Sequence, residues 1–296
     1  MRTRRFVFLP LLFFALCAIA SSQTHWVVAQ PVLDMYRGPS LDNDVVSQAR
    51  YGMTVEQIPS KDTPPEGWVQ IKTPDDYPGF VQRSGLLPLD EKENYAGAGK
   101  RVVKVINRTA NVYREMDVTS HAPMLVLPYE TALEVIAVPK KGGERWLQVR
   151  LVDGRQAWIQ WGDVQERTDK TLSIDEAIAL AKKFLGVTYT WGGTSSFGYD
   201  CSGFMQMLMR ERGVLMPRDA DVQAAWSGVV PVKREELKPG DLLYFGSSAK
   251  KITHTGMYIG NGEFIHDTTH DHPMVQISRL DDQPWTKLLV ACRRAK

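Results

Sequence analysis

The stretch YTWGGTSSFGYDCSG, residues 189–203, places a cysteine between a Gly-rich segment and the start of a predicted helix. We predict this helix over about 202–212, ending at Gly213. Upstream, Ser173 and Glu176 form a capping box, and apolar residues at helical spacing predict a helix that Gly186 ends. Five strand-like runs follow, at 241–245, 254–259, 263–267, 274–278 and 287–293. Helices followed by an antiparallel sheet predict an α+β domain over residues 172–296.

Cys201 is expected to be a reactive cysteine because it opens a helix. Backbone N–H groups are unpaired at a helix start and the helix dipole is positive there, so a thiolate is stabilised. The neighbours of Cys201 are small and polar, whereas Cys292 lies in an apolar run that is typical of a structural cysteine. The two could still form a disulfide, but their surroundings favour a nucleophile at Cys201 and a buried thiol at Cys292.

A cysteine nucleophile needs a histidine base and a group that orients the base. His254 begins one predicted strand and His266 lies in the next, and the turn between them, Gly260-Asn261-Gly262, favours a hairpin. If the hairpin centres near Gly260, the two imidazoles share one face, whereas a slip of one residue would separate them. Each histidine alone could be a polar residue on a solvated face. Together with Cys201, they favour a base and its orienter.

The run 266–272 contains three histidines and two aspartates, which could bind Zn²⁺ or Cu²⁺. One loop rarely supplies a whole structural site, so we expect a solvated polar loop and no metal site. The segment Trp191-Gly192-Gly193 is no phosphate loop, because the Gly-Lys-Ser/Thr of that motif does not follow. No cofactor is expected.

A repeat runs through the N-terminal half at offsets of 77 and 78 residues. A constant offset over several blocks indicates a duplicated domain. Each copy, 28–90 and 100–168, has short alternating runs broken by Gly, Pro and Asp, which predict a small all-β barrel or sandwich. The polar segment 89–100 is expected to link them. The matching blocks are Met35-Tyr36-Arg37 with Val112-Tyr113-Arg114, Trp68-Val69-Gln70-Ile71 with Trp146-Leu147-Gln148-Val149, and Phe80-Val81-Gln82 with Trp158-Ile159-Gln160.

Residues 1–20 indicate an export signal. Three arginines precede the apolar run Phe6–Leu16, and Ala18-Ile19-Ala20 fits the small-x-small cleavage rule. The alternatives are an uncleaved anchor and a lipoprotein at Cys17, but the run is short and Leu16 is too bulky for a lipid-attachment motif. We therefore expect soluble export to the periplasm or cell envelope, with no membrane attachment after cleavage.

The composition is that of a globular protein. The chain has 296 residues, 43% hydrophobic and 24% charged, which excludes disordered, collagenous and coiled-coil classes. No later apolar run reaches the roughly 20 residues of a membrane-spanning helix, so a multi-pass membrane protein is excluded. Removing the three N-terminal arginines leaves 33 basic against 34 acidic residues, so the net charge changes from +2 to −1. No basic cluster remains, and neither nucleic acid nor an anionic membrane is expected as a partner. A monomer is expected.

Five motifs that occur in order resemble those of the NlpC-type cell-wall cysteine peptidases, which have a papain-like fold. The resemblance covers about 175–296, and the N-terminal copies resemble tandem bacterial SH3-like domains. It implies that Cys201 is the nucleophile, His254 the base and His266 the third polar residue, and that Tyr189 helps to stabilise the oxyanion. Tyr189 and Trp191 could instead be core aromatics. The motifs are Tyr189-Thr190-Trp191-Gly192-Gly193, Asp200-Cys201-Ser202-Gly203, Pro239-Gly240-Asp241-Leu242, His254-Thr255-Gly256-Met257-Tyr258 and Phe264-Ile265-His266.

The whole chain is similar to γ-D-glutamyl-diamino-acid peptidases of the dipeptidyl-peptidase VI type. In those, an SH3-like domain closes one end of the cleft, and an acidic residue and a tyrosine hold the free amine of L-alanine. Asp44 and Tyr77 match these positions, with aspartate standing where glutamate is usual, and Tyr77 could instead pack as a strand aromatic. The expected substrate-binding set from the second part of the chain is Trp191, Asp200, Ser202, Arg218 and Asp219, in which Asp200 could merely cap the helix.

The resemblance implies a cysteine peptidase that hydrolyses the γ-D-Glu–diamino acid bond of peptidoglycan-derived peptides. A thiolate–imidazolium pair would attack the γ-glutamyl carbonyl and release L-Ala-γ-D-Glu from peptides with a free N-terminal L-Ala. One alternative is an endopeptidase or lysin whose SH3-like domains bind the intact wall. The other is a non-catalytic binding protein, against which the combination of Cys201, His254 and His266 argues.

Overall fold

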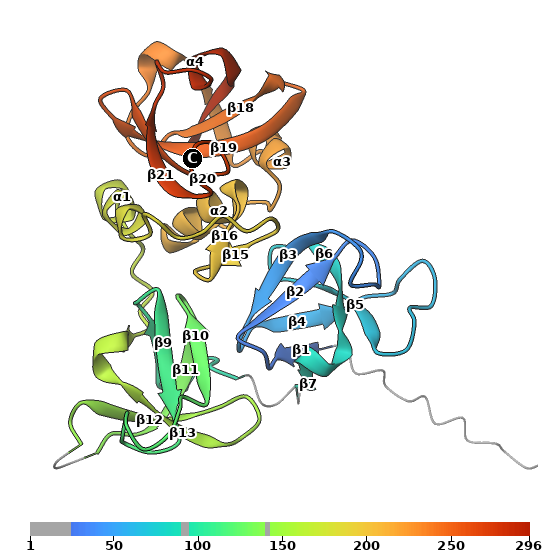
Figure 1. The fold of residues 1–296 in the computed structure, drawn as a ribbon, viewed down its shortest axis with the longest axis vertical. Helices are drawn as coiled ribbons and strands as arrows, with labels where there is room; N and C mark the ends of the chain where they lie inside the picture. The colour runs from blue at the N-terminus through green and yellow to red at the C-terminus, as the bar shows by residue number, and fades with distance from the viewer. Residues whose placement is uncertain (1–24, 90–94, 140–142) are drawn as a thin grey trace, which may run out of the picture.

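The computed structural model describes residues 25–89, 95–139 and 143–296. The predicted signal peptide lies outside these residues, as does part of the expected linker 89–100. The described chain forms two all-β bodies and a mixed C-terminal domain, which lies above both of them in Figure 1. In the described ranges no helix is both long and apolar enough to cross a membrane.

The first body is a seven-stranded sheet in the order β3-β2-β6-β5-β4-β1-β7. Its neighbouring strands are antiparallel, and alternate residues point into a small apolar core that includes Met35, Ile71 and Val81. The strands are β1 His25–Val28, β2 Val32–Tyr36, β3 Val45–Arg50, β4 Thr54–Gln57, β5 Trp68–Lys72, β6 Pro78–Gln82 and β7 Leu86–Pro88, with the 3-10 turn η1 Arg83–Gly85 before the last.

The second body has the same strand order, β10-β9-β13-β12-β11-β8-β14, so the sequence repeat corresponds to a repeated fold. The packing repeats as well. Tyr36 meets Trp68 edge to face at 5.4 Å, and Tyr113 meets Trp146 in the same way at 5.6 Å. The strands are β8 Val102–Val105, β9 Thr109–Tyr113, β10 Leu125–Pro128, β11 Ala132–Ala137, β12 Trp146–Arg150, β13 Gln156–Gln160 and β14 Val164–Glu166, with η2 Trp161–Asp163.

The C-terminal domain is an antiparallel six-stranded sheet in the order β17-β22-β18-β19-β20-β21, with helices on both faces. Helix α2 packs on one face through Phe204 and Leu208, and the short helix α4 packs on the other through Trp285. The elements are α1 Ile174–Lys183, β15 Thr194–Ser195, β16 Gly198–Tyr199, α2 Cys201–Glu211, α3 Ala220–Ala225, β17 Val229–Val232, η3 Arg234–Glu236, β18 Leu242–Ser248, β19 Lys251–Gly260, β20 Glu263–Thr268, β21 Met274–Arg279, α4 Trp285–Leu288 and β22 Leu289–Ala295.

Most of the predicted elements of this domain are present, but one strand begins later than predicted and several short elements were not predicted. The capping box of α1 is confirmed, because the Ser173 side chain accepts from the backbone of Glu176 and the Glu176 carboxylate accepts from the backbone of Ser173. The strand predicted at 287–293 was wrong at its start, where α4 turns Trp285 into the core before β22 begins. Helix α3 and strand β17 were not predicted, because each is too short to show a period.

A buried ion-pair network joins all three bodies. Glu130, which follows β10, accepts from Arg210 of α2 at 2.8 and 2.6 Å. Arg50 of β3 lies 3.7 Å from the same carboxylate. Although burial alone would raise the pKa of Glu130, the charges of Arg210 and Arg50 lower it to about 2. The carboxylate therefore stays ionised and holds two cations from the neighbouring bodies.

Replacing Glu130 by glutamine should destabilise the protein by about 3–5 kcal/mol, because two buried guanidinium groups lose their counter-charge. In the folded protein the pKa of Glu130 lies below the ordinary value of 4.5. Its contribution to the free energy of unfolding is therefore complete above pH 4.5 and is lost as the pH falls toward 2. Urea unfolding of the variant and the wild type at neutral pH and at about pH 3 measures both effects. Glu166→Gln is the matched control, because its pair with Arg101 is exposed and should contribute less than about 1 kcal/mol.

Candidate active site

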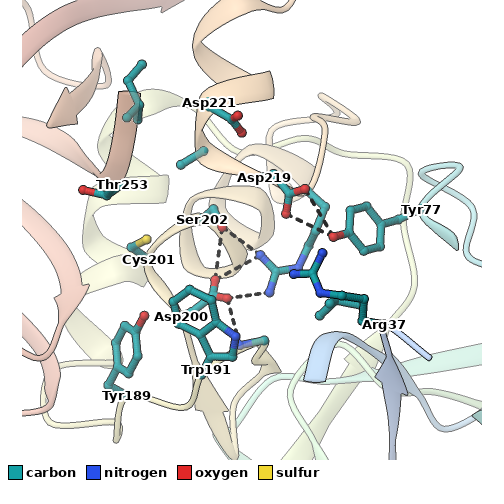
Figure 2. Close-up of a pocket in the computed structure, with 15 residues that line it drawn as sticks. Arg37, Tyr77, Tyr189, Trp191, Asp200, Cys201, Ser202, Asp219, Asp221 and Thr253 are labelled. Atoms are coloured by element: carbon teal, nitrogen blue, oxygen red, sulfur yellow. Dashed lines mark hydrogen bonds and ion pairs between the residues drawn. The ribbon is translucent and has the colours of Figure 1, made fainter. Parts of the chain in front are cut away.

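A cavity of about 360 Å³ opens at the start of α2, between the C-terminal domain and the first sheet. In Figure 2, Cys201 and Tyr189 lie on the left of the view and Tyr77 lies on the right, with Asp200 and Ser202 between them. Eight of the predicted site residues line it: Tyr77, Tyr189, Trp191, Asp200, Cys201, Ser202, Arg218 and Asp219. Lining residues that were not predicted are Arg37, Val46, Gly192, Ala220, Asp221, Ile252 and Thr253.

Cys201 is the first residue of α2, as expected, and its thiol is free. Asp200 caps the helix by accepting from the backbone N–H of Gly203 at 2.7 Å. The preceding loop packs so closely on the first turn that a Cβ at residue 203 would lie 2.1 Å from the carbonyl oxygen of Gly193. Glycine at 203 therefore permits the contact that presents the thiol to the cavity. Cys292 is also free and lies in a separate core cluster, which confirms that the two cysteines are not paired.

Burial raises the pKa of the Cys201 thiol to about 12, and the charge of Asp200 adds to this. The backbone N–H groups of Thr255 and Ser202 act in the opposite direction by hydrogen-bonding the sulfur. Thr255 directly follows His254 in β19, so the thiol lies beside the strand that carries the predicted base. The surroundings thus keep the thiol neutral at neutral pH and supply donors for a thiolate as it forms.

The two histidines form a hydrogen-bonded pair. His254 Nε2 lies 2.7 Å from His266 Nδ1, and His266 Nε2 lies 2.9 Å from the Ser278 hydroxyl. The β19–β20 register pairs Met257 with Ile265, so His254 lies two residues beyond the position opposite His266. The imidazoles therefore share a face, as predicted, but meet diagonally.

This chain of hydrogen bonds is compatible with a tautomer of His254 that suits a base. If His254 Nε2–H donates to His266 Nδ1, then His266 Nε2–H donates to Ser278, and Nδ1 of His254 is left as an acceptor. Burial lowers the pKa of His254 to about 3, with a further contribution from the charge of His270. The imidazole is therefore neutral, and burial favours a neutral thiol–imidazole pair over the thiolate–imidazolium pair expected from the sequence. His254 can then act as a general base during attack by the sulfur.

Trp285 covers the histidine pair on the side away from the cavity. Its ring centroid lies 5.3 Å from that of His254 and 4.7 Å from that of His266. This contact excludes water from the imidazoles and explains much of their burial. Neither Trp285 nor Ser278 could be identified from a local motif, because each meets the histidines only through the fold.

Two aromatic residues expected at the site have different surroundings. The hydroxyl of Tyr189 points toward the Cys201 side of the cavity in Figure 2, and burial raises the pKa of this phenol, so it remains a proton donor. Trp191 is 66% exposed at the rim of the cavity, so the alternative that it is a core aromatic is wrong. An exposed indole beside a cavity is available to cover a bound ligand.

Asp200, Ser202 and Arg218 form a closed network at the cavity floor. Arg218 donates to both oxygens of Asp200, at 3.0 and 2.5 Å, and to the Ser202 hydroxyl at 2.7 Å. Asp200 also accepts from the backbone N–H of Gly192 at 3.1 Å. The Asp200 carboxylate is thus already bound by several donors, so its expected role as an amine ligand has little support in this geometry. Its evident part is to hold Arg218 and the first turn of α2.

Tyr77 reaches the site from the turn after β5. Its hydroxyl donates to the Asp219 carboxylate, with both oxygens at 3.2 Å, across the boundary between the first sheet and the C-terminal domain. The alternative that Tyr77 only packs within its own sheet is therefore wrong. Burial raises the pKa of Asp219, and the positive charge of Arg218 opposes this shift. Asp219 has no ion-pair partner among the described residues, and its contact with Tyr77 sets its carboxylate where the first sheet meets the cavity, in a position that can receive an ammonium.

Asp44 requires a correction. It does not line the cavity, and its side chain is 69% exposed beside Arg37, at 3.5 Å. The first sheet instead contributes Arg37, Val46 and Tyr77 to the cavity wall. Gln48 and Thr194 hold the first sheet against the C-terminal domain. The Gln48 side-chain oxygen accepts from the backbone N–H of Thr194, and the Gln48 backbone oxygen accepts from the Thr194 hydroxyl, each at 3.0 Å. This orientation turns Asp44 toward solvent.

The histidine-rich run 266–272 does not gather its side chains. His266 is buried against Ser278, whereas His270 packs on Trp285 at the surface. Within the described ranges, no three His, Cys, Asp or Glu side chains are placed so that they could hold a metal ion.

Truncating the residues that orient His254 should slow turnover in a graded way. We expect His266→Ala to lower kcat by about 10²–10³-fold, because the base loses its tautomer control. Ser278→Ala removes one hydrogen bond from the far end of the chain and should lower kcat by about fivefold. Steady-state kinetics should show the loss in kcat with KM nearly unchanged. A Ser278 variant as slow as the His266 variant would contradict this ordering.

The comparisons with known proteins agree with this geometry. The NlpC/P60 family model matches residues 186–294. The chain is 30% identical over 266 residues to a γ-D-glutamyl-L-lysine dipeptidyl-peptidase of Bacillus cereus, covering 85% of this chain and 75% of that protein. It is 29% identical to the protein of the same name from Bacillus subtilis, with 87% and 83% covered. The crystal structure of an NlpC/P60 family protein from Bacillus cereus superposes with a TM-score of 0.77 at 24% identity, covering 92% of this chain and 99% of that one.

Proposed function

Because the chain belongs to the NlpC/P60 family and is a cysteine peptidase, we propose that it hydrolyses the γ-D-Glu–diamino acid bond of peptidoglycan stem peptides. The relatives named above are dipeptidyl-peptidases that act on a γ-D-glutamyl-L-lysine bond. We further propose that it releases L-Ala-γ-D-Glu from peptides with a free N-terminal L-Ala. The observation that carries this mode is the Tyr77–Asp219 contact, which joins the first sheet to the wall of the cavity.

The proposed steps use Cys201 and Tyr189, which line the cavity, and His254, which does not line it but directly precedes Thr255, whose backbone hydrogen-bonds the Cys201 sulfur. The Cys201 sulfur attacks the γ-carbonyl carbon of D-Glu while Nδ1 of His254 accepts the thiol proton. The Tyr189 hydroxyl and the backbone N–H of Cys201 stabilise the oxyanion of the tetrahedral intermediate. His254 then protonates the leaving amine of the diamino acid, and a thioester remains. Water, deprotonated by His254, hydrolyses the thioester and restores the thiol.

Charge supports the orientation of the substrate. The α-ammonium of L-Ala would lie against Asp219 and the Tyr77 hydroxyl, at the end of the cavity where the first sheet docks. Arg37, from the same sheet, would offer a positive charge to the α-carboxylate of D-Glu. An uninterrupted glycan strand attached to L-Ala would meet this wall. The alternative of an endopeptidase acting on intact wall has less support for that reason.

We also propose that the two all-β bodies are SH3-like, that the protein is exported to the periplasm or cell envelope, and that it acts as a monomer. The repeated strand order supports the first of these. The second rests on the pattern of residues 1–20.

Product analysis tests the proposed bond. The synthetic peptide L-Ala-γ-D-Glu-L-Lys should yield L-Ala-γ-D-Glu and free lysine, identified by mass spectrometry. Release of L-alanine, or no cleavage by an enzyme that cuts other peptidoglycan fragments, would place the scissile bond elsewhere.

A further inference from the structure

Asp267 of β20 is a fully buried carboxyl group that has no role in the steps described above. Its side chain is 0% exposed, and neither carboxyl oxygen makes a hydrogen bond of ordinary geometry. It lies on the face of β20 that packs against α2, because Ile265, two residues earlier, belongs to the core shared with that helix. A buried polar group without partners is costly and calls for an explanation.

Asp267 ends a row of polar side chains that crosses the sheet beneath α2. Tyr244 of β18 pairs with Thr255 of β19. The β19–β20 pairing ends at Met257 and Ile265, and the same count along both strands brings Thr255 level with Asp267, two residues beyond the last pair. The Tyr244 and Thr255 hydroxyl oxygens are also buried without hydrogen-bond partners. The row is therefore a polar strip inside an otherwise apolar core.

This strip leads to the reacting sulfur. The backbone N–H of Thr255 is one of the groups that hydrogen-bond the Cys201 sulfur. The charges of both Asp267 and Cys201 act on Tyr189, the proposed oxyanion donor, so Asp267 lies within electrostatic reach of the site. Asp267 thus lies behind the place where negative charge develops, first on sulfur and then on the tetrahedral oxygen.

A carboxylate in this position would be buried without a counter-ion. Transferring an unpaired charge into such surroundings is so unfavourable that the group takes up a proton instead. Burial raises the pKa of Asp267 to about 8, the charge of Asp200 adds to this, and the backbone N–H of Thr268 lowers it in part. The side chain is therefore a neutral carboxylic acid at neutral pH.

We propose that Asp267 is a positioning residue that must be protonated for Cys201 to react, so that its ionisation sets the alkaline limit of the enzyme. This inference rests on the proposed cysteine-peptidase chemistry. Loss of the proton would add a negative charge behind the forming thiolate and oxyanion and disfavour both. The deprotonation is a simple transfer to water and needs no other reactant.

The other charged and titratable groups near Asp267 do not cancel this effect. Its charge reaches Tyr189, from the loop before β15, and Asp200, at the start of α2. Asp200 is compensated by Arg218, which leaves no cation for Asp267. Its partner on β21 is Val275, and Thr255, which is level with it on β19 beyond the last pair, is uncharged.

The pH dependence of kcat distinguishes this role from a structural one. At saturating L-Ala-γ-D-Glu-L-Lys, the wild type should lose about tenfold more kcat than Asp267→Asn between about pH 7 and pH 9, because the amide cannot ionise. The comparison with the variant removes the effect of the substrate's own α-ammonium, which titrates in the same range. Tyr244→Phe is the matched control from the same strip. Its kcat should fall between about pH 7 and pH 9 as much as that of the wild type.

Infrared difference spectroscopy gives a second readout that needs no substrate. Between about pH 7 and pH 9 the wild type should lose the band of a protonated carboxyl as Asp267 ionises. The band should be absent from Asp267→Asn. If no carboxyl titrates in this range, or if the two enzymes have superimposable alkaline limbs, the proposal is overturned. Because the infrared test is independent of turnover, it separates a failure of this proposal from a failure of the proposed substrate.

Discussion

Cys201→Ala should abolish hydrolysis of L-Ala-γ-D-Glu-L-Lys, with kcat/KM falling by at least about 10⁴-fold. The reason is that the sulfur is the group that lies at the start of α2 and opens into the cavity, and alanine has no replacement for it. His254→Ala should have a similar effect, because no base then accepts the proton of the neutral Cys201 thiol as its sulfur attacks. Release of lysine from the tripeptide measures both losses.

Cys292→Ala is the matched control for this experiment. Cys292 is the other buried free cysteine, and it lies in the core cluster around Trp285 rather than at the cavity. We expect it to lower stability somewhat while keeping turnover within about threefold of the wild type. Thermal unfolding should show that the Cys201 variant is folded. A folded Cys201→Ala enzyme with wild-type turnover would rule out the cysteine-peptidase chemistry.

Acetylating the α-amine of the tripeptide should lower kcat/KM by several orders of magnitude. Each charged hydrogen bond of the ammonium to Asp219 or Tyr77 contributes roughly 1.5–3 kcal/mol, or about ten- to a hundred-fold in rate. The acetyl group removes this charge and adds bulk against the wall that the first sheet supplies. Peptides still attached to glycan should be cut slowly for the same reason, so labelled sacculi should release little dye.

Two variants locate this recognition. Asp219→Asn should lower kcat/KM for the free-amine peptide and leave kcat/KM for the acetylated peptide unchanged. The difference in kcat/KM between the two peptides therefore becomes smaller. Asp44→Asn should change neither, because that carboxylate lies in solvent beside Arg37. Equal rates on free and acetylated peptide would exclude the exopeptidase mode and favour an endopeptidase. An effect of Asp44→Asn equal to that of Asp219→Asn would place the ammonium elsewhere.

The sequence predicted those parts of the site that depend on local structure. The position of Cys201 follows from a helix cap at Asp200, and the proximity of His254 and His266 follows from one hairpin. Asp200 and Cys201 are adjacent, and His254 and His266 are 12 residues apart, so a short stretch of sequence is enough to predict each arrangement. The same holds for the duplicated sheets, because Trp68 and Trp146 occupy equivalent strands.

Contacts between distant elements could not be predicted in this way. Ser278 meets His266 only through the register of β20 and β21. The choice between Asp44 and Asp219 depends on how the first sheet docks, and that is decided by contacts such as Gln48 with Thr194. The burial of Asp267 depends on which face of the sheet α2 covers. For Asp44 and Asp267 the deciding partner lies far away in the sequence, so no local pattern distinguishes the alternatives. Ser278 lies only 12 residues from His266, but no motif marked it as a partner of that histidine.

The identical topology of the two sheets allows one position to be followed through a duplication. In the first copy the turn after β5 is closed by a hydrogen bond from Thr73 N to Tyr77 O, and in the second the equivalent bond runs from Leu151 N to Arg155 O. Tyr77 faces the cavity, whereas Arg155 pairs with Asp153 at the surface. The same turn position therefore makes different contacts in the two copies, lining a cavity in the first and pairing at the surface in the second. A repeated scaffold can thus carry a binding wall in one copy without repeating it in the other.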